Sequence, residues 1–430
     1  MNSPTSWVRR DAAVVWHGFT QMSSYETNFP VIVERGEGHE LIDVDGNRYL
    51  DAISSLWVNT MGHRVPELDA ALREQLDRVA HTTLLGNGNR VVIELAEALA
   101  VVVPVDQPHF LFAADGAAAV EQALKIAFQH WVNLGVKGRR QYLALGNAYH
   151  GDTVGSLALG AGGFGTDLFD ALRFPVLRTP GYDNPAWLET AIRHVESHAH
   201  ELAAVVIEPL VQGAAGMLTA LPDDLRTLGR ACRDLGVLLI CDEVATGFGR
   251  TGSLFASEQC GLRPDLLCLG KGITAGYLPM SATVAAGHVF ASFLGPDLSE
   301  KTFYHGHSYG GNALAAAVAL RHLALFEEKG VLDNVALRSA QLRSELSGRV
   351  QTLSGVSAIR QCGLMAGVEL APPTGATWGR SVCAAAVRRG VLLRPLGEVV
   401  TIVPPLTVTS EEVDRIVAVL VASIDEVRAG

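Results

Sequence analysis

Short apolar runs alternate with amphipathic helical stretches through the middle of the chain, and this alternation limits the possible folds more than any other pattern in the sequence. The strand-like runs lie at His109–Phe112, Gln141–Leu145, Ala203–Ile207, Val237–Cys241, Asp265–Leu269 and Ser281–Ala285. The helical stretches lie at Pro66–Ala80, Val91–Val102, Ala117–Leu134, Asp223–Leu235 and Asn312–Glu328. Because the strand-like runs are apolar on both faces, we expect a mainly parallel sheet covered by helices on both sides.

The two ends of the chain do not follow this alternation. Near the N-terminus, Leu41–Val44 and Arg48–Asp51 flank Asp45-Gly46, a pair that is typical of a hairpin turn. In the tail we expect helices and strands at Leu332–Leu346, Val356–Arg360, Met365–Leu370 and Thr377–Arg389, and a last helix after Ser410. The chain is therefore predicted to have a large α/β domain at 63–328 and a small α+β domain formed by 1–62 and 329–430.

The composition excludes several classes of partner. Thirty-four Lys and Arg against 45 Asp and Glu give a net charge of −11, which disfavours nucleic acid and anionic membranes. The apolar stretch Ala12–Trp16 is too short for a secretion signal, and Leu202–Leu218 is interrupted by Glu208 and Pro209. The six cysteines form no C-x-x-C pair. We therefore expect a cytoplasmic protein with reduced cysteines and no membrane span.

An acid and a lysine follow two of the predicted strands. Asp242 directly follows the run Val237–Cys241, and Lys271 stands between Gly270 and Gly272 after the run Asp265–Leu269. Ligands bind at the carboxyl ends of strands in open α/β sheets. A lysine there is either a solvated surface residue or a Schiff-base lysine, and the acid is either a loop residue or the partner of a pyridinium nitrogen.

Two further segments could serve a phosphorylated, flat ligand. Asp115-Gly116-Ala117 opens a helix, whose free amides can receive a phosphate. Asp115 is equally explained as an ordinary helix cap. Tyr149, after the next strand, could stack on a ring.

Other motifs indicate no additional site. Gly160–Gly165 matches G-x-G-x-x-G, but Pro175 leaves little room for the helix of a dinucleotide fold. His194, His198 and His200 share a predicted helix but lack a companion ligand, so we expect no metal.

With these residues placed, the chain resembles the class III, pyridoxal-phosphate-dependent aminotransferases of fold type I over nearly its whole length. The motifs that carry the resemblance are Asp242-Glu-Val-Ala-Thr-Gly-Phe-Gly-Arg250-Thr-Gly252 and Leu269-Gly-Lys271-Gly272. It is similar in particular to the branch that acts on 8-amino-7-oxononanoate in biotin synthesis. That likeness rests on Trp16-His17, Ser54–Trp57, Ala148–Thr153, Ile207–Met217 and His305–Ser308 with Asn312.

The resemblance implies a role for each matching residue. It implies Lys271 as the Schiff-base lysine, Asp242 as the partner of the pyridinium nitrogen, and Tyr149 as the residue that stacks on the ring. It also implies Gly116 and Ala117 as phosphate-binding amides, with Ser308 reaching the phosphate from a second subunit of a homodimer. For the substrates it implies Trp57 and Phe19 in the pocket wall, Gly306 nearby, and Arg394 binding a carboxylate.

The chain departs from the family pattern at three positions. Asp115 stands where a serine is usual, and we expect it to cap the helix and point aside. Leu56 replaces a second tryptophan and Phe19 replaces a tyrosine. These two differences slightly favour lysine over S-adenosylmethionine as the expected amino donor. The rival hypotheses are another ω-aminotransferase, for ornithine, 4-aminobutyrate, β-alanine or a diamine, and a nonenzymatic binding protein on the same scaffold.

Overall fold

A large mixed sheet forms the centre of the molecule. The structure is a computed structural model that describes residues 6–28, 30–161 and 166–429. The sheet has the strand order β4-β12-β11-β10-β7-β5-β6. Its strands are β4 (His109–Ala113), β5 (Gln141–Leu145), β6 (Leu177–Thr179), β7 (Leu202–Ile207), β10 (Leu238–Asp242), β11 (Leu266–Leu269) and β12 (Ser281–Ala285). All six strands predicted from the apolar runs are confirmed.

The sheet differs from the expectation in two respects. Strand β12 runs antiparallel to both β11 and β4, because the segment 270–280 is too short for the crossover that a parallel neighbour needs. The edge strand β6 was not predicted, since a run of three residues carries little periodicity.

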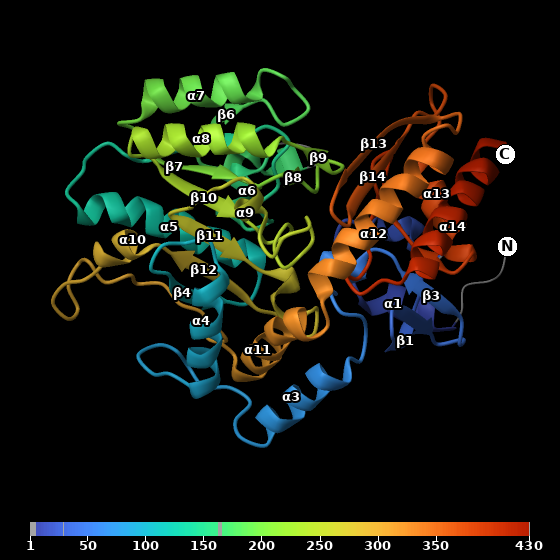
Figure 1. Cartoon of the computed structure of the whole chain (residues 1–430), viewed down its shortest axis with the longest axis horizontal. Coiled ribbons are helices and arrows are strands. Elements are labelled where there is room, and N and C mark those ends of the chain that lie inside the picture. Colours follow the sequence, from blue (N-terminus) through green and yellow to red (C-terminus); the bar gives the residue numbers. More distant parts are fainter. Residues whose placement is uncertain (1–5, 29, 162–165, 430) are drawn as a thin grey trace.

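Helices cover both faces of this sheet, as the apolar runs predicted. Helix α5 (Gly116–Asn133) packs on one face, and α7 (Trp187–His198) and α8 (Pro222–Asp234) pack on the other (Figure 1). Helices α3 (Pro66–Leu76) and α4 (Arg90–Val102) both pack against α11 (Ala313–Glu328) beside it. Shorter elements are α6 (Val154–Leu159), α9 (Ala256–Gln259), α10 (Gly287–Ala291), the 3-10 turns Thr166–Leu172 and Lys271–Thr274, and the strands β8 (Val211–Gln212) and β9 (Leu218–Thr219).

Segments from the two chain ends lie side by side in a second body. Strands β1 (Val33–Glu37), β2 (Glu40–Asp43) and β3 (Arg48–Asp51) form the predicted hairpin region, and β3 pairs in parallel with β15 (Val391–Leu392). The tail contributes β13 (Val356–Cys362), β14 (Met365–Leu370), β16 (Arg394–Leu396), β17 (Val399–Ile402), α12 (Val331–Glu345), a π-helical turn (Leu346–Val350), α13 (Gly379–Arg388) and α14 (Ser410–Ala429). The domain boundaries themselves stay a prediction.

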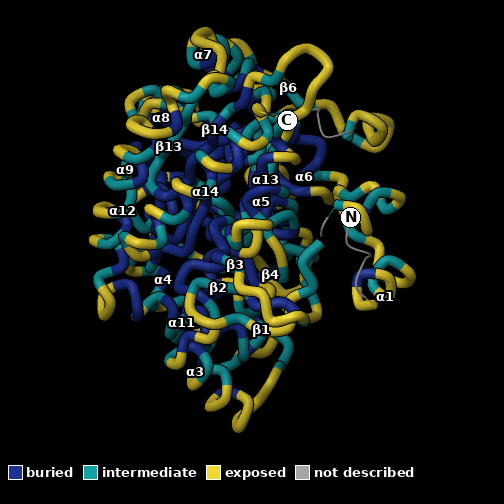
Figure 2. Tube along the Cα trace, turned by 90° about the vertical axis from the view of Figure 1, so that its right-hand side faces the viewer, coloured by how far each residue is buried: buried dark blue, intermediate teal, exposed yellow. Residues whose placement is uncertain are grey.

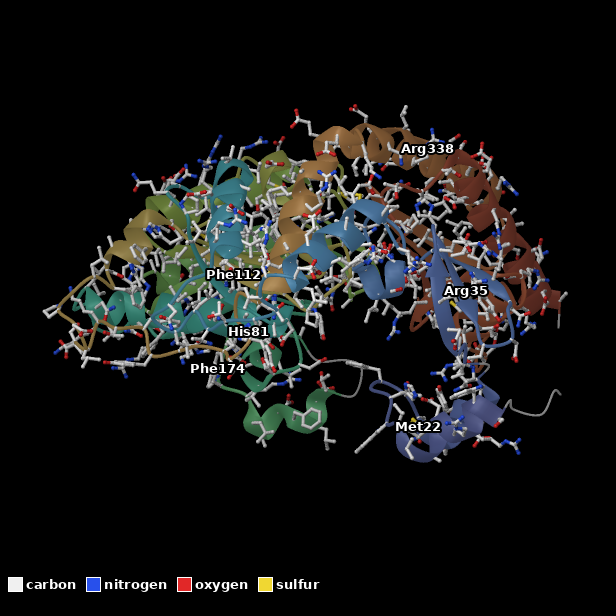
Figure 3. The ribbon with its side chains drawn as sticks, turned by 90° about the horizontal axis from the view of Figure 1, so that it is seen from below. Met22, Arg35, His81, Phe112, Phe174 and Arg338 are labelled. Carbon is white, nitrogen blue, oxygen red and sulfur yellow. The ribbon has the colours of Figure 1, made fainter. Side chains whose placement is uncertain are left out.

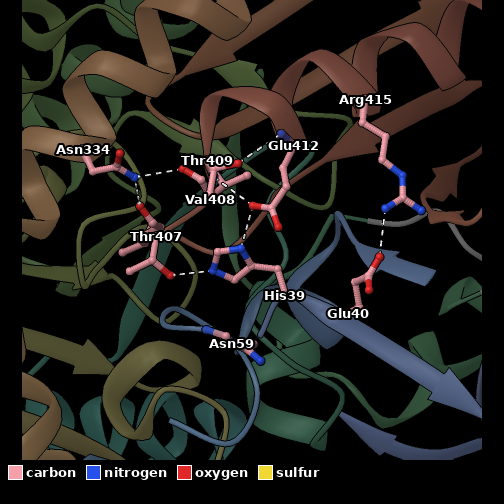
Figure 4. A network of polar contacts seen from close by, with 11 residues as sticks. His39, Glu40, Asn59, Asn334, Thr407, Val408, Thr409, Glu412 and Arg415 are labelled. Carbon is pink, nitrogen blue, oxygen red and sulfur yellow. Dashed lines mark hydrogen bonds and ion pairs between the residues drawn. The ribbon is translucent and has the colours of Figure 1, made fainter. Parts of the chain in front are cut away.

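Polar contacts hold the two chain ends together. His39 Nδ1 lies 2.6 Å from Glu412 Oε2 and its Nε2 lies 2.8 Å from Thr407 Oγ1. Arg415 Nη1 donates to Glu40 Oε1 at 2.8 Å (Figure 4). The first two turns of α14 are thereby held against the start of strand β2.

Burial follows this arrangement. The buried residues run through the middle of the molecule, and the exposed ones lie at its periphery (Figure 2). Helix α1 (Ser6–Val14) and the 3-10 turn Met22–Thr27 lie apart from the two main bodies (Figure 3). Among the described helices, none combines the length and the apolar character needed to cross a bilayer.

Candidate active site

Asp242 and Lys271 lie at the same edge of the large sheet. Strands β10 and β11 are parallel neighbours in which Asp242 is paired with Cys268, so Lys271 follows only three residues beyond that pair. Burial lowers the pKa of the Lys271 amine, and the charges of Asp242 and Glu208 oppose this without cancelling it. A lysine with a lowered pKa has more of its amine in the neutral, nucleophilic form.

Asp242 is held by a histidine to which sequence reasoning assigned no role. His150 Nδ1 lies 2.7 Å from Asp242 Oδ2, and the amide of Val244 donates to Asp242 Oδ1 at 3.0 Å. Burial acts to lower the pKa of His150, but the hydrogen bond and charge of Asp242 outweigh it and raise that pKa. The carboxylate is therefore fixed in orientation, with His150 Nδ1–H as its donor.

A second buried acid connects two loops beside this pair. Glu208 Oε1 accepts from the amide of Tyr149 at 3.1 Å, and its Oε2 accepts from the amide of Gly213 at 3.3 Å. Burial raises the pKa of Glu208 to about 7. The Tyr149 hydroxyl donates to Asp152 at 2.9 Å, so both ends of this tyrosine are held in place.

The N-terminus of α5 lies close to the Asp242 segment. Asp115 caps the helix, as expected, since its Oδ1 accepts from the amide of Ala118 at 2.9 Å. Within the described ranges no hydrogen bond uses the amides of Gly116 and Ala117, which are among the donors that a helix start leaves free. A Cβ at Gly116 would lie 2.5 Å from a methyl of Val244, so only glycine lets the helix start approach that strand end.

Trp57 lies close to Lys271, with the lysine amine over its indole ring. Lys271 Nζ is 5.1 Å from the centre of the Trp57 indole, and Trp57 is 6% exposed. The turn that carries it, α2 (Ser54–Trp57), has φ values of 49°, 47°, 72° and 68° at its four residues. Each residue in this left-handed conformation costs about 1–2 kcal/mol unless it is glycine.

Four predicted site residues are not brought into this cluster by contacts within the described chain. Phe19 is 63% exposed, and Gly306 and Ser308 are also exposed. The Ser308 carbonyl accepts from His81 Nε2 at 2.7 Å. Arg394 lies on β16, and in the part of the chain that is described its guanidinium makes no ion pair or hydrogen bond. Their roles stay predictions.

The motif Gly160–Gly165 falls partly outside the described residues, which end at 161 and resume at 166.

Comparison with known proteins defines the class. The family model "Aminotransferase class-III" matches residues 21–424, and the chain belongs to this family. Class III aminotransferases depend on pyridoxal 5′-phosphate, so this chain is a transaminase that uses that cofactor.

The individual matches cover nearly the whole chain. A relative from Nitratidesulfovibrio vulgaris, named adenosylmethionine-8-amino-7-oxononanoate aminotransferase, is 46% identical over 95% of this chain and 79% of its own. A relative of the same name from Geobacter sulfurreducens is 41% identical over 99% and 98%. The crystal structure of the enzyme of that name from Methanocaldococcus jannaschii has a TM-score of 0.94 at 38% identity, covering 98% of each chain. The ω-transaminase from Pseudomonas jessenii in complex with PMP has a TM-score of 0.91 at 28% identity, covering 99% of each chain.

The residues of the site fit this cofactor. Among the described residues, His150 Nε2 and Trp57 Nε1 are buried without a hydrogen-bond partner, and the amides at the start of α5 are free to bind an anion. Gly151 has a φ of 127°, and a Cβ there would lie 2.4 Å from that of Ala117. An amine, a carboxylate, a ring-stacking tyrosine and a helix N-terminus are the groups that a phosphorylated pyridine aldehyde needs.

Three buried polar residues in and near the site were given no role in the sequence analysis. His150, Glu208 and Arg250 all fell inside quoted motifs, but no role was assigned to them. Arg250 is 1% exposed, and its guanidinium donates to the carbonyls of Asn59, at 2.8 Å, and Pro404. A charged residue inside an otherwise apolar, glycine-rich segment is the signal that could have drawn attention to Arg250.

Proposed function

We propose that this transaminase transfers an amino group from S-adenosylmethionine to 8-amino-7-oxononanoate, giving 7,8-diaminononanoate in biotin synthesis. The observation that carries the proposal is the shared name of the relatives that match over nearly the full length at 34–46% identity. Retention of Lys271 and Asp242 at neighbouring strand ends supports it against the nonenzymatic alternative.

The residues that would hold the cofactor come from four elements. We assign its carbonyl carbon to Lys271, its ring nitrogen to Asp242, its phosphate to the amides of Gly116 and Ala117, and one ring face to Tyr149. When bound, pyridoxal phosphate supplies an electron sink for the bonds at the reacting carbon.

The side chains then divide the remaining work. Lys271 Nζ, whose pKa is lowered by burial, takes a proton from the reacting carbon and returns it. His150 keeps the Asp242 carboxylate directed at the ring nitrogen through its 2.7 Å contact. Arg394 would bind the carboxylate of the acceptor, and Trp57, Phe19 and Gly306 would line its path.

We further propose that the active sites are shared within a homodimer, with Ser308 reaching the cofactor phosphate of the other subunit. Large exposed side chains around Ser308 support this, because Leu85, Tyr304 and Tyr309 are 63%, 66% and 68% exposed in the single chain.

A hybrid dimer tests the sharing. One subunit carries Lys271→Ala and the other Ser308→Ala. If Ser308 acts across the dimer, one site keeps both an intact Lys271 and an intact Ser308, and the hybrid has about half the wild-type activity. If Ser308 acts within its own subunit, neither site is intact, and the hybrid has only about half the activity of the Ser308→Ala homodimer.

We place the reaction in the cytoplasm. All six cysteines are free and five of them are buried, as expected for a protein of a reducing compartment.

Lysine is the second candidate for the amino donor. Phe19 and Leu56 remove a hydroxyl and an indole from the wall that would face the S-adenosylmethionine cation, a loss of about 1 kcal/mol each. Stopped-flow mixing of the purified enzyme with one donor at a time, followed by the cofactor absorbance, decides between them. Faster conversion by lysine overturns the choice of S-adenosylmethionine. Product analysis with 8-amino-7-oxononanoate, with 4-oxobutanoate, which would give 4-aminobutyrate, and with further aldehyde acceptors tests the acceptor.

A further inference from the structure

The turn that carries Trp57 is wound left-handed through four consecutive residues that are not glycine. Ser54, Ser55, Leu56 and Trp57 have φ values between 47° and 72°. Hydrogen bonds close the turn, from the Trp57 amide to the Ile53 carbonyl at 2.8 Å and from the Val58 and Asn59 amides to the Ser54 carbonyl at 2.9 and 3.0 Å. L-residues avoid this region, so a run of four persists only where surrounding groups hold it.

Asp51 is the group that holds it. This residue is fully buried, and both of its carboxylate oxygens bind Ser55. Oδ1 accepts from the Ser55 amide at 2.9 Å, and Oδ2 accepts from the Ser55 hydroxyl at 2.7 Å. The contact therefore fixes the backbone and the side chain of the second residue of the turn.

A histidine and an asparagine orient this carboxylate in turn. His63 Nε2 lies 3.0 Å from Asp51 Oδ2, and Asn59 Nδ2 lies 3.1 Å from His63 Nδ1. Since the side-chain NH2 group of Asn59 can only donate, His63 Nδ1 accepts from it and His63 Nε2–H donates to Asp51. Burial acts to raise the pKa of Asp51, but His63 and Ser55 outweigh it and lower that pKa. The four residues form one chain of polar contacts from Asn59 to Ser55.

Trp57, at the far end of the turn, lies between Gly213 and Lys271. The six-membered edge of Trp57 packs on Gly213, where an added Cβ would lie 3.1 Å from Trp57 Cζ3. Lys271 Nζ is 5.1 Å from the indole centre. Nε1 is buried and has no partner among the described residues, so it is a donor available to a ligand.

We propose that Asp51 is a positioning residue for the acceptor pocket, which acts by holding the left-handed turn in the one conformation that presents the Trp57 indole beside Lys271. It does so through Ser55 on one side and His63 on the other, without touching the substrate. The inference rests on the proposed function only in taking Trp57 as part of the substrate pocket.

The test uses the holoenzyme and five variants, namely Asp51→Asn, and Leu56→Gly and Leu298→Gly each in the wild-type and the Asp51→Asn background. Asp51→Asn keeps the shape of the side chain but replaces one accepting oxygen by an amide that faces the donors of His63 and Ser55. Leu56→Gly, in the wild-type and the Asp51→Asn background, removes the cost of the left-handed φ of 72° at that position. Leu298→Gly is the matched control, because Leu298 is also an exposed leucine with a positive φ, of 57°, outside the site.

Two readouts are compared. Hydrogen exchange at the amides of Trp57, Val58 and Asn59, measured without substrate, reports the turn directly. Steady-state kinetics with 8-amino-7-oxononanoate report the pocket. We expect Asp51→Asn to raise the exchange rate at these three amides by about tenfold. The acceptor KM should also rise by about tenfold, with kcat changed less than about threefold. Adding Leu56→Gly should recover at least half of each effect on a logarithmic scale, and adding Leu298→Gly should recover none.

Three outcomes overturn the proposal: unchanged exchange at the three amides, an unchanged acceptor KM with faster exchange, or equal recovery by Leu298→Gly, which would mean a general effect on stability. If Asp51→Asn does not fold, Ser55→Ala replaces it, because it removes only the hydroxyl contact from an exposed residue. It should move both readouts in the same direction by a smaller amount, and no change in exchange refutes the role. If the proposed function fails, the exchange result stands and the KM effect appears with the true acceptor instead.

Discussion

Replacing Asp242 by Asn perturbs the site at its most constrained contact. Asp242 Oδ2 lies 2.7 Å from His150 Nδ1, and Oδ1 accepts from the Val244 amide at 3.0 Å. The asparagine oxygen can still accept from Val244, but its NH2 group then faces the N–H of His150. His150 must move its proton to Nε2, which has no partner in the described part of the protein.

Two costs follow from this geometry. A buried donor left without a partner destabilises the fold by about 1–3 kcal/mol. Removing the negative partner of a buried cation costs about 3–5 kcal/mol, and here the cation is the protonated ring nitrogen of the cofactor. Since each 1.36 kcal/mol is about tenfold in rate, turnover should fall by roughly 10²- to 10⁴-fold.

The assay separates the two costs. Turnover is measured at saturating cofactor, and stability is measured by urea unfolding of the same preparations. The matched control is Asp43→Asn, since Asp43 is also buried, at 8% exposure, and accepts from Asn47 and Tyr49 in the β2–β3 hairpin. It should lose stability and keep its turnover. A loss of only a few-fold in Asp242→Asn, or an equal loss in the control, refutes the reasoning.

Three more substitutions give distinct outcomes. Lys271→Ala should leave the fold intact and abolish turnover, and borohydride reduction with peptide mapping should label Lys271 in the wild type; a label on another lysine contradicts the assignment. Arg394→Ala should weaken the carboxylate-bearing acceptor by about 2 kcal/mol, near thirtyfold in KM, and an unchanged KM would rule out its role. Burial raises the pKa of Glu208 to about 7 from 4.5, so the native state holds a proton that the unfolded state releases. This contribution to stability is complete below pH 4.5 and is lost as the pH rises through 7. Glu208→Gln should flatten that part of the pH dependence of the urea midpoint, and an unchanged slope would show that Glu208 ionises normally.

The order of strands and helices could be predicted because it depends on local periodicity. Strands β5 and β12 agree with their predicted ranges at both ends, and helix α5 differs by one residue at each end. The direction of β12 could not be taken from its apolar composition, because direction depends on the length of the connection that precedes it.

The candidate site was predictable in part for the same reason. Asp242 is the last residue of β10 and Lys271 stands two residues after β11, so their shared edge was implied once the strands were parallel neighbours. Phe19, Gly306 and Ser308 are exposed in the single chain, so their roles stay predictions.

Local sequence patterns identify which chemical groups this protein has and at which strand ends and helix starts they stand. Folding determines how those groups are held: His150 against Asp242, Glu208 between two loops, and Asp51 against Ser55 in the left-handed turn that ends at Trp57. Periodicity and turn chemistry are properties of neighbouring residues, whereas the burial that shifts a pKa and the contacts that stabilise a left-handed turn come from segments brought together only by folding.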